Sequence, residues 1–165
     1  MEAQCSQCGK RKKSSDMCSV DGKNICHQCM YGDVKPVPVY PIGIVRNTQK
    51  RASIRFGVKN KSDVSKIELN PSQKPFMYKL EDETYITVIY HLHESKPVKS
   101  VFRRGLDGKK VGVFASRTPD RLSGLAIQDV RLDRIEGTTL FVEGLDAIDG
   151  SPVLDIKLCW HNPSR

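Results

Sequence analysis

Alternation of apolar and polar residues, together with short β-branched runs, dominates the chain after residue 50. Ile54, Phe56 and Val58 fall on every second position, as expected where one face of a sheet is buried. Residues 84–90 combine Thr, Tyr, Ile and Val, the residue types that pack well on a pleated surface. Both segments are therefore predicted strands.

Further short apolar runs, separated by turn signals, extend this pattern toward the end of the chain. The turn signals are Asp107-Gly108, Glu136-Gly137 and Asp149-Gly150. No apolar i, i+3, i+4 pattern holds for three turns in the sequence, so long helices are not expected. The prediction is an all-β body, an antiparallel β-barrel-like domain with at most a short helix. Its additional strands are expected at residues 111–116, 125–132, 139–145 and 153–158.

Two Cys-x-x-Cys pairs precede this body: Cys5 with Cys8, and Cys26 with Cys29. The spacer between them is typical of four-thiolate zinc sites. A segment of about thirty residues buries too little apolar surface to fold unaided, so a bound metal would have to supply the missing stability. The sequence predicts a small zinc ribbon with a structural zinc ion. Redox or disulfide-bonded pairs and an iron–sulfur cluster are the alternatives.

Other cysteine and histidine residues are weaker candidates for metal ligands. Cys18 lies between the pairs and is expected to be a small buried residue of the connecting hairpin, with ligation as a second option. His27 could replace a cysteine ligand, and Cys159 is expected to be a packed or partly exposed thiol. His91 and His93 are two residues apart and would share one face of a strand. They are either half of a metal site or ordinary polar residues.

The segment Asp33-Val34-Lys35-Pro36-Val37-Pro38-Val39 separates the cysteine pairs from the predicted strands. Alternating prolines favour the extended polyproline II conformation, so this segment is predicted to be a stiff linker. The expected organisation is a zinc ribbon at residues 1–33, a linker at 34–39, a barrel domain at 40–160 and a tail at 161–165.

The chain is basic, with 27 Lys and Arg against 19 Asp and Glu and a net charge of +8. Such a charge favours polyanionic partners, nucleic acid above all, although a basic protein without this role is the alternative. Two basic clusters are candidates for RNA phosphate contacts or for exposed basic loops. They are Lys10, Arg11, Lys12 and Lys13, and Arg103 with Arg104.

Several classes of protein are disfavoured. No apolar run approaches the roughly 18 residues that span a bilayer, and the polar start Met1-Glu2-Ala3-Gln4 lacks the features of a secretory signal. We expect a soluble, cytoplasmic protein without membrane contact. No Gly-x-Gly-x-x-Gly follows a predicted strand, and strands do not alternate with long helices, which tells against a Rossmann fold.

Three segments, in order along the chain, together resemble one family. They are Tyr40-Pro41-Ile42-Gly43-Ile44-Val45-Arg46, then Val111-Gly112-Val113-Phe114-Ala115-Ser116-Arg117-Thr118-Pro119, then Gly144-Leu145-Asp146 with Asp149-Gly150-Ser151-Pro152-Val153-Leu154-Asp155-Ile156-Lys157. The pattern resembles the TsaA-like, or TrmO-like, family of S-adenosylmethionine-dependent tRNA methyltransferases. That resemblance implies transfer of methyl to N6 of an already modified adenosine beside the anticodon. It also implies a cofactor pocket built from barrel loops at a homodimer interface.

The resemblance also suggests which residues form the site. Asp149 and Asp155 are the candidate catalytic carboxylates, which would take a proton from the amine or attract the sulfonium. The candidate cofactor-binding residues are Arg117, Thr118, Pro119, Arg121, Ser123, Gly150, Ser151, Pro152 and Lys157. Alternatively, residues 149–152 form an ordinary turn and Arg117 pairs with Asp155 to close the barrel.

One segment departs from the family pattern. After Arg121 the family usually has Pro-Asn-Pro-Ile-Gly, whereas this chain has Leu122-Ser123-Gly124-Leu125-Ala126. Ser123 offers a hydroxyl in place of an amide, and the missing prolines leave a looser loop. The preferred hypothesis is a methyltransferase with a ribbon that aids RNA capture. The alternative is a non-enzymatic RNA- or nucleotide-binding barrel, and a zinc-dependent protein-interaction adaptor comes third.

Overall fold

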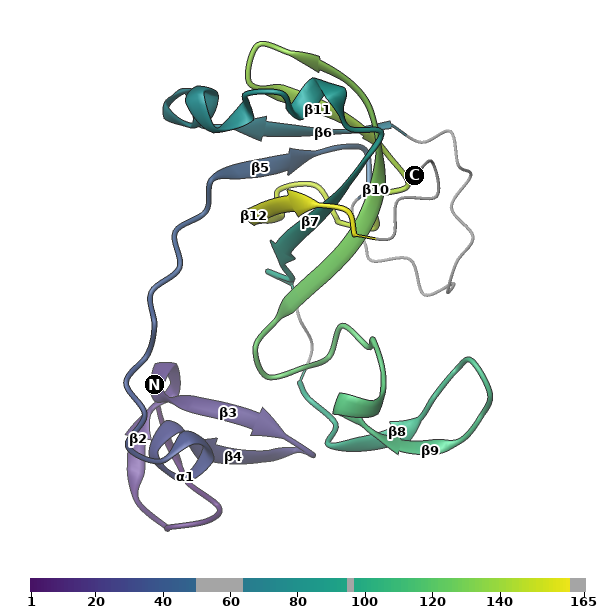
Figure 1. Cartoon of the computed structure of the whole chain (residues 1–165). Helices are drawn as coiled ribbons and strands as arrows, with labels where there is room; N and C mark the ends of the chain where they lie inside the picture. The colour runs from purple at the N-terminus through teal and green to yellow at the C-terminus, as the bar shows by residue number, and fades with distance from the viewer. Residues whose placement is uncertain (50–63, 95–96, 161–165) are drawn as a thin grey trace. The chain divides into compact units, whose positions relative to one another are not determined.

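The computed structural model describes residues 1–49, 64–94 and 97–160, and they fall into two compact units (Figure 1). The first unit combines Met1–Pro38 with Glu94–Gly124, and the second combines Val39–His93 with Leu125–Arg165. Residues 94–124 therefore group with the N-terminal segment, not with the strands that flank them in the sequence. The predicted strand around Ile54 and the predicted tail at 161–165 lie outside the described residues.

The second unit is a closed, six-stranded antiparallel barrel, which confirms the predicted fold class. Going round the barrel, the order is β10-β11-β6-β5-β12-β7, and β7 pairs with β10 to close it. Each of the six strands is therefore hydrogen-bonded to a neighbour on both sides over part of its length. The strands are β5 (Gly43–Arg46), β6 (Val64–Leu69), β7 (Tyr85–His91), β10 (Leu125–Glu136), β11 (Thr139–Glu143) and β12 (Pro152–Leu158).

Apolar side chains on alternate strand positions fill the barrel. Along β6 buried and exposed residues alternate strictly, with Ile67 and Leu69 in the core. Ile67, Ile86 and Leu140 are fully buried and come from three different strands. The polar Ser65 is also buried, but its hydroxyl accepts a hydrogen bond from Asn47 Nδ2 at 3.1 Å. The interior is therefore a packed core in which this polar group is satisfied.

Glycine is required at two positions in the barrel, one where two strands lie very close together and one in a tight turn. At Gly43 an added Cβ would lie 2.5 Å from the carbonyl oxygen of Glu68 and 2.9 Å from Cα of Leu69 on the neighbouring β6, so only glycine fits. Gly137 has φ of 63° in the two-residue turn that joins β10 to β11. That conformation strains other residues, and it confirms the turn predicted from Glu136-Gly137.

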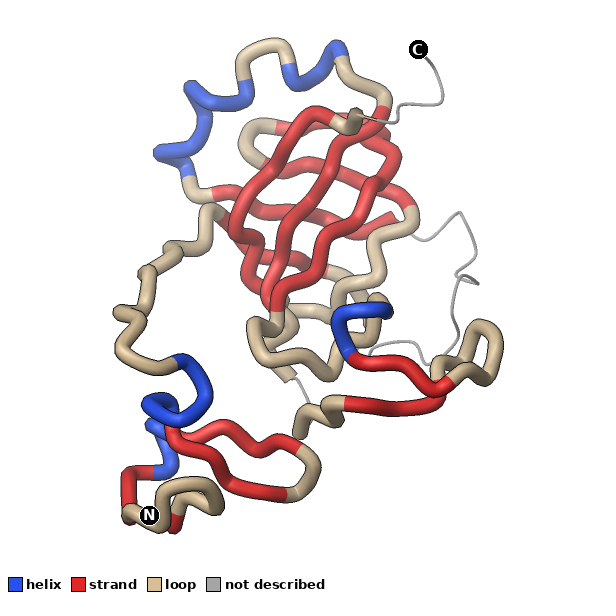
Figure 2. The backbone as a smooth tube through the Cα atoms, turned by 60° about the horizontal axis from the view of Figure 1, so that its bottom comes forward, coloured by secondary structure: helices blue, strands red, loops and turns tan. Residues whose placement is uncertain are grey.

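The first unit contains short antiparallel pairs and one short α-helix (Figure 2). β1 (Glu2–Gln4) pairs with β2 (Arg11–Lys13), β3 (Met17–Val20) with β4 (Lys23–Cys26), and β8 (Val101–Arg103) with β9 (Lys110–Gly112). The helix α1 (His27–Tyr31) follows β4 directly. None of the described helices is long and apolar enough to cross a bilayer.

The structure corrects several predicted elements. The strand expected at residues 111–116 ends at Gly112 and continues as a 3-10 helix, η4 (Val113–Ala115), because the Ser116 hydroxyl donates to the Val113 carbonyl and closes the turn. The strand β6 was not predicted. Three further 3-10 helices were also missed: η1 (Ser14–Asp16), η2 (Pro71–Met77) and η3 (Leu80–Asp82).

Candidate functional site

The four predicted zinc ligands lie together. The sulfur atoms of Cys5, Cys8, Cys26 and Cys29 are all within 4.8 Å of one another, and Cys8 Sγ is 3.9 Å from Cys26 Sγ. Four thiolates around one zinc ion at about 2.3 Å would be about 3.8 Å apart in a tetrahedron. Cys26 precedes α1 and Cys29 lies one turn further on, so both project toward the first pair. The arrangement fits a tetrahedral metal ion.

The electrostatics of the cluster also call for a cation. The backbone N–H groups of Cys26 and Gln7 donate to Cys5 Sγ at 3.3 and 3.4 Å, and these bonds lower the pKa of the Cys5 thiol to about 6. Side-chain hydrogen bonds with Cys26 and Cys8 raise the pKa of Cys29 to about 12. Thiolates this close repel one another, so a metal ion is needed to hold all four ionised.

The weaker candidate ligands lie outside this cluster. Cys18 is half-buried, and its Sγ lies 3.4 Å from the hydroxyl of Tyr31. His27 is exposed, with its ring centroid 5.7 Å from that of Tyr31. Cys159 is buried in the second unit. Among the described residues, the four-cysteine group is the one set of at least three potential ligands that comes together.

The predicted cofactor loop in the first unit is held by its own side chains. The guanidinium of Arg121 donates to the carbonyl oxygens of Thr118 at 2.9 Å and Ser116 at 2.7 Å. Ser116 Oγ accepts from the Thr118 N–H, and Thr118 Oγ1 accepts from the Asp120 N–H, each at 3.4 Å. Arg121 therefore shapes the loop, whereas Arg117 is exposed on it.

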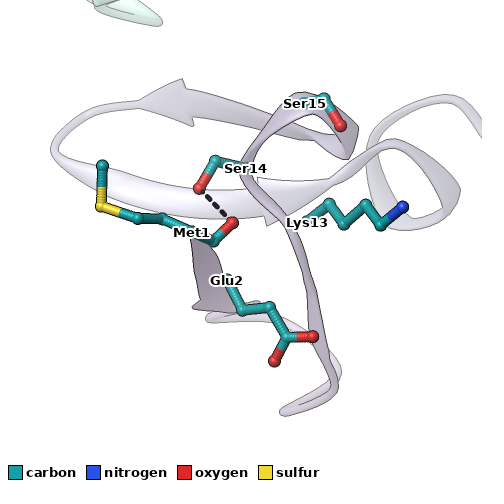
Figure 3. A pocket seen from close by; sticks show the side chains of 5 residues that line it. All are labelled: Met1, Glu2, Lys13, Ser14 and Ser15. Carbon is teal, nitrogen blue, oxygen red and sulfur yellow. Dashed lines mark hydrogen bonds between the residues drawn. The ribbon is translucent and has the colours of Figure 1, made fainter.

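Two surface hollows occur in the first unit. Lys99, Phe102, Arg103, Thr118 and Asp120 line one of about 300 Å³, which brings predicted RNA-binding and cofactor-binding residues together. The other, of about 420 Å³, is lined by Met1, Glu2, Lys13, Ser14 and Ser15, and the Ser14 hydroxyl donates to the Met1 carbonyl at 3.0 Å (Figure 3). Predicted RNA-binding residues line both hollows, Arg103 the smaller and Lys13 the larger, and Thr118 adds a predicted cofactor-binding residue to the smaller one.

The loop between β11 and β12 carries Asp149, Gly150 and Ser151, and it is tied to the segment after β5. Asp149 Oδ1 accepts from the Asn47 N–H at 3.1 Å, and the Asp149 N–H donates to the Gln49 carbonyl at 2.7 Å. The Asn47 side chain also donates to the Ala147 carbonyl at 2.8 Å. Asp149 is exposed yet held in place, and Gly150 follows it with φ of 82°. Residues 149 and 150 therefore do form a turn.

His93 joins this loop instead of forming a metal pair with His91. Its Nδ1 lies 3.4 Å from Oγ of the buried Ser151, and a Cβ added at Gly150 would lie 3.7 Å from its Nε2. His91 belongs to β7, where it pairs with Leu125 of β10. The structure thus brings His93, Gly150 and Ser151 together.

Asp155 and Lys157 form an ion pair on β12, with Asp155 Oδ2 2.7 Å from Lys157 Nζ. Asp155 Oδ1 also accepts from the Ile156 N–H at 2.9 Å. The register of β12 against β7 shifts between Val153 and Asp155, a bulge that redirects the side chains there. Asp155 thus has a charged partner within its own strand.

Sequence reasoning missed three polar side chains that fix the β11–β12 loop, two on barrel strands and one in the segment after β5. Gln128 on β10 donates from Nε2 to the Gly144 carbonyl at 2.6 Å and accepts from the Asp146 N–H at 2.8 Å. Tyr90 on β7 is buried and donates to the Asp146 carbonyl at 3.0 Å. Burial raises the pKa of the Tyr90 hydroxyl, so it remains protonated. Gln49 Nε2 lies 3.2 Å from Asp146 Oδ1.

The predicted RNA-binding residues all belong to the first unit. Lys10, Arg11, Lys12 and Lys13 are exposed, and Arg11 forms a solvent-exposed ion pair with Glu2 at 3.5 Å. Arg103 is exposed as well. Arg104 instead binds Asp107 at 2.6 Å and the Ala115 carbonyl at 3.1 Å, and the bond to Asp107 raises the pKa of its guanidinium.

Comparison with known proteins identifies the family. The model of the tRNA-methyltransferase O N-terminal domain matches residues 48–162, well over half of the chain. The chain belongs to this family. The matched region begins after β5, so the segment with the four cysteines lies outside it.

Relatives from archaea and mammals agree with this assignment. A probable S-adenosyl-L-methionine-binding protein of Methanothermobacter thermautotrophicus is 37% identical over 123 residues, covering 73% of this chain and 88% of that protein. A probable S-adenosyl-L-methionine-binding protein of Pyrococcus abyssi is 31% identical over 119 residues, covering 71% of this chain and 65% of that protein. The mouse tRNA (adenine(37)-N6)-methyltransferase is 33% identical over 81 residues, covering 47% and 19%. The chain thus spans less than two thirds of some of these relatives.

Solved structures share the TrmO fold. A crystal structure of TrmO from Pseudomonas aeruginosa has a TM-score of 0.61 and 27% identity, covering 77% of this chain and 56% of that one. In the present TrmO domain, Leu125 and Ala126 of the divergent segment begin β10, where they pair with His91 and Tyr90. Part of the segment that departs from the Pro-Asn-Pro-Ile-Gly pattern is therefore strand here.

Proposed function

We propose that this chain is an S-adenosylmethionine-dependent methyltransferase that acts on N6 of a modified adenosine, of the threonylcarbamoyladenosine type, in the tRNA anticodon loop. The observation that carries the proposal is the family match over residues 48–162, which includes both segments that hold the proposed site residues. Relatives named for S-adenosylmethionine binding and for methylation of tRNA adenine 37 support the cofactor and the substrate.

The chemistry asks mainly for positioning, because the bound S-adenosylmethionine supplies an already activated methyl group. The protein must orient the exocyclic amine and accept its proton. We propose Asp149 for this step, since its carboxylate is exposed and its Oδ1 is fixed by the Asn47 N–H. Asp155, which forms an ion pair with Lys157 at 2.7 Å, is the second proposed carboxylate and would accept the proton or attract the sulfonium.

The proposed cofactor contacts come from two segments with different properties. Residues 117–123 provide guanidinium and hydroxyl donors suited to a carboxylate, and residues 149–152 provide a carboxylate suited to a sulfonium. Within the first set, Arg117 is the exposed guanidinium and Arg121 the one that supports the loop. The full proposed set is Arg117, Thr118, Pro119, Arg121, Ser123, Gly150, Ser151, Pro152 and Lys157.

Four further features complete the proposal. The four cysteines bind a structural zinc ion. The tRNA phosphates are contacted by exposed basic residues: Lys10, Arg11, Lys12, Lys13 and Arg103. Arg104 stabilises the β8–β9 hairpin, which carries Arg103, through its bonds to Asp107 and the Ala115 carbonyl. Two copies of the chain form a homodimer. The protein acts in the cytoplasm, where its substrate is found.

The test combines binding and catalysis with the full chain. Calorimetric titration with S-adenosylmethionine should show saturable binding, and incubation with tRNA carrying threonylcarbamoyladenosine should add one methyl group to that nucleoside by mass spectrometry. Unmodified tRNA is the matched control and should remain unchanged. Methylation of both RNAs would refute the proposed substrate, and absence of cofactor binding would refute the enzyme.

One observation favours a second candidate, a non-enzymatic RNA-binding barrel. The segment that departs from the family pattern contains no proline, and its last two residues are the first two residues of β10. A protein of this kind would bind tRNA in the experiment above without binding S-adenosylmethionine, so the same titration separates the two candidates.

A further inference from the structure

The net charge of the chain is concentrated in the first unit. Its two segments hold 14 Lys and Arg against seven Asp and Glu, so this unit carries +7 of the total of +8. The barrel unit is nearly neutral, with 13 basic and 12 acidic residues. If the protein binds a polyanion, most of the electrostatic attraction must therefore come from the ribbon and from residues 97–124, which we call the arm.

The ribbon and the arm are joined by backbone hydrogen bonds at one place. Val20 of β3 forms a parallel bridge with Val98. The Val98 N–H donates to the Ser19 carbonyl at 3.1 Å, and the Asp21 N–H donates to the Val98 carbonyl at 2.9 Å. The turn between β3 and β4 thus meets the segment just before β8 (Figure 1).

One side-chain pair closes this junction. The carboxylate of Asp21 accepts from the backbone N–H of Ser100 at 2.9 Å and from its hydroxyl at 2.5 Å. Asp21 adopts a positive φ of 51° and is followed by Gly22 with φ of 74°, so the two form the tight turn of the β3–β4 hairpin. The two hydrogen bonds from Ser100, and to a smaller extent the charges of Lys23 and Lys99, lower the pKa of the Asp21 carboxyl.

The junction connects directly to the loop that carries Arg117. The Ser100 carbonyl accepts from the Val113 N–H at 3.0 Å, which fixes the start of η4. Arg104 then links the β8–β9 hairpin to the end of η4 through Asp107 and the Ala115 carbonyl. A chain of contacts therefore runs from the hairpin turn of the ribbon to the residues just before the Arg117 loop.

We propose that the zinc ribbon and the arm bind RNA as one rigid basic unit, and that Asp21 and Ser100 are positioning residues that hold the two halves together. The inference rests on the proposed function, because it takes RNA to be the polyanion. Exposed cations lie on both halves: Lys10, Arg11, Lys12 and Lys13 on the ribbon, and Lys99, Arg103, Lys109 and Lys110 on the arm. When the two halves are joined, binding of one half to an RNA gives the other half a high effective concentration at the same RNA. Two separate halves would bind independently and more weakly.

The first test measures RNA binding by the full-length, zinc-loaded protein. The probe is an RNA stem-loop with an anticodon-loop sequence, followed by fluorescence anisotropy over a range of salt concentrations. Lys12→Ala on the ribbon and Lys110→Ala on the arm should each reduce the salt slope by about 0.7 to 0.9. A slope that changes with the arm variant alone would overturn the inference and assign the ribbon surface to a different partner.

The second test addresses the junction. Ser100→Ala removes the hydroxyl donor without removing a charge, and it should weaken RNA binding about tenfold by uncoupling the two halves. Ser100→Thr retains the hydroxyl and should restore binding. Ser15→Ala is the matched control, because the Ser15 hydroxyl donates to Asp16 within the ribbon alone. Wild-type affinity for Ser100→Ala would overturn the proposal, and so would a loss of affinity for Ser15→Ala equal to that for Ser100→Ala.

A third measurement needs no RNA and separates this inference from the proposed function. Hydrogen exchange at the Val98 and Asp21 amides should be slow in the intact protein and should accelerate when a chelator removes zinc, because the ribbon then releases the arm. If Ser100→Ala is poorly folded, Asp21→Asn is the second variant: it leaves Ser100 one acceptor oxygen in place of two, and asparagine tolerates the positive φ. Its effect is measured by exchange at the Val98 amide, because the lost charge would itself change RNA binding. Unchanged exchange on chelation would refute the coupling. Failure of the wild-type chain to bind RNA would instead refute the proposed function.

Discussion

The side-chain amide of Gln128 pairs with the backbone at Asp146, whose N–H donates to Gln128 Oε1 at 2.8 Å. The same amide donates from Nε2 to the Gly144 carbonyl at 2.6 Å. Gln128 therefore satisfies one donor and one acceptor of the β11–β12 loop from a neighbouring strand, as a paired backbone would. The position of the residues around Asp149 depends on this contact.

Replacing this amide should loosen the loop. Gln128→Ala leaves the Asp146 N–H and the Gly144 carbonyl without these bonds, and we expect the free energy of unfolding to fall by about 1–3 kcal/mol. Binding of S-adenosylmethionine should weaken as well. Chemical denaturation and calorimetry measure the two effects. Gln73→Ala, in the connection between β6 and β7, is the control and should change neither quantity. Equal behaviour of the two variants would contradict the role assigned to Gln128.

Much of the barrel could be predicted because its information is local. Alternation and turn residues placed β7, β10, β11 and β12 within a few residues of their observed bounds. The hairpin at Gly137 followed from the conformational freedom of glycine. The strand predicted at residues 111–116 was wrong beyond Gly112. The apolar run there favours a strand, but the Ser116 hydroxyl bonds to the Val113 carbonyl and closes a 3-10 turn.

The close approach of Gly43 on β5 to β6 predicts the effect of one substitution on stability. Gly43→Ala would place a methyl group 2.5 Å from the Glu68 carbonyl oxygen, and backbone on both strands would have to move. We expect a loss of about 1–3 kcal/mol in the free energy of unfolding, as for overpacked cores. Gly112→Ala is matched to it, because its φ is −73° and the nearest atom to its Cβ would be 3.8 Å away. Thermal unfolding of both variants should separate them, and a shared shift in Tm would contradict the steric explanation.

The candidate site was predictable only in part, because its supporting residues are specified by distant contacts. The cysteine cluster follows from sequence spacing, and its four sulfur atoms do converge. Gln128 and Tyr90 were recognised only as strand residues, since the loop they hold is 16 or more positions away. The bond between Asp21 and Ser100 spans 79 positions and leaves no periodic signal in the sequence.

Arg121 and Arg117 should respond differently to the same substitution. Arg121→Lys removes the planar fork that reaches the carbonyls of Thr118 and Ser116 at once, so the loop should lose its shape. We expect a fall in kcat/KM for methyl transfer close to that of Arg121→Ala, in the range of ten- to a hundredfold. Arg117→Lys keeps an exposed positive charge and should retain more activity than Arg117→Ala. Steady-state kinetics tests both pairs, and full activity of Arg121→Lys would show that charge alone matters there.

The four-cysteine cluster yields a prediction about metal stoichiometry and pH. The full chain should bind one zinc ion, measured by elemental analysis, and Cys26→Ser should lose it because three thiolates remain of a tetrahedral set. Cys18→Ser is the matched control, since Cys18 lies outside the cluster beside Tyr31, and it should retain the metal.

Zinc retention should fall as the pH is lowered, because protons compete with the metal for the thiolates. Neighbouring thiols raise the pKa of Cys29 to about 12, so this ligand in particular must lose its proton when zinc binds at neutral pH. Loss of zinc from both variants, or retention by both, would contradict the four-cysteine site.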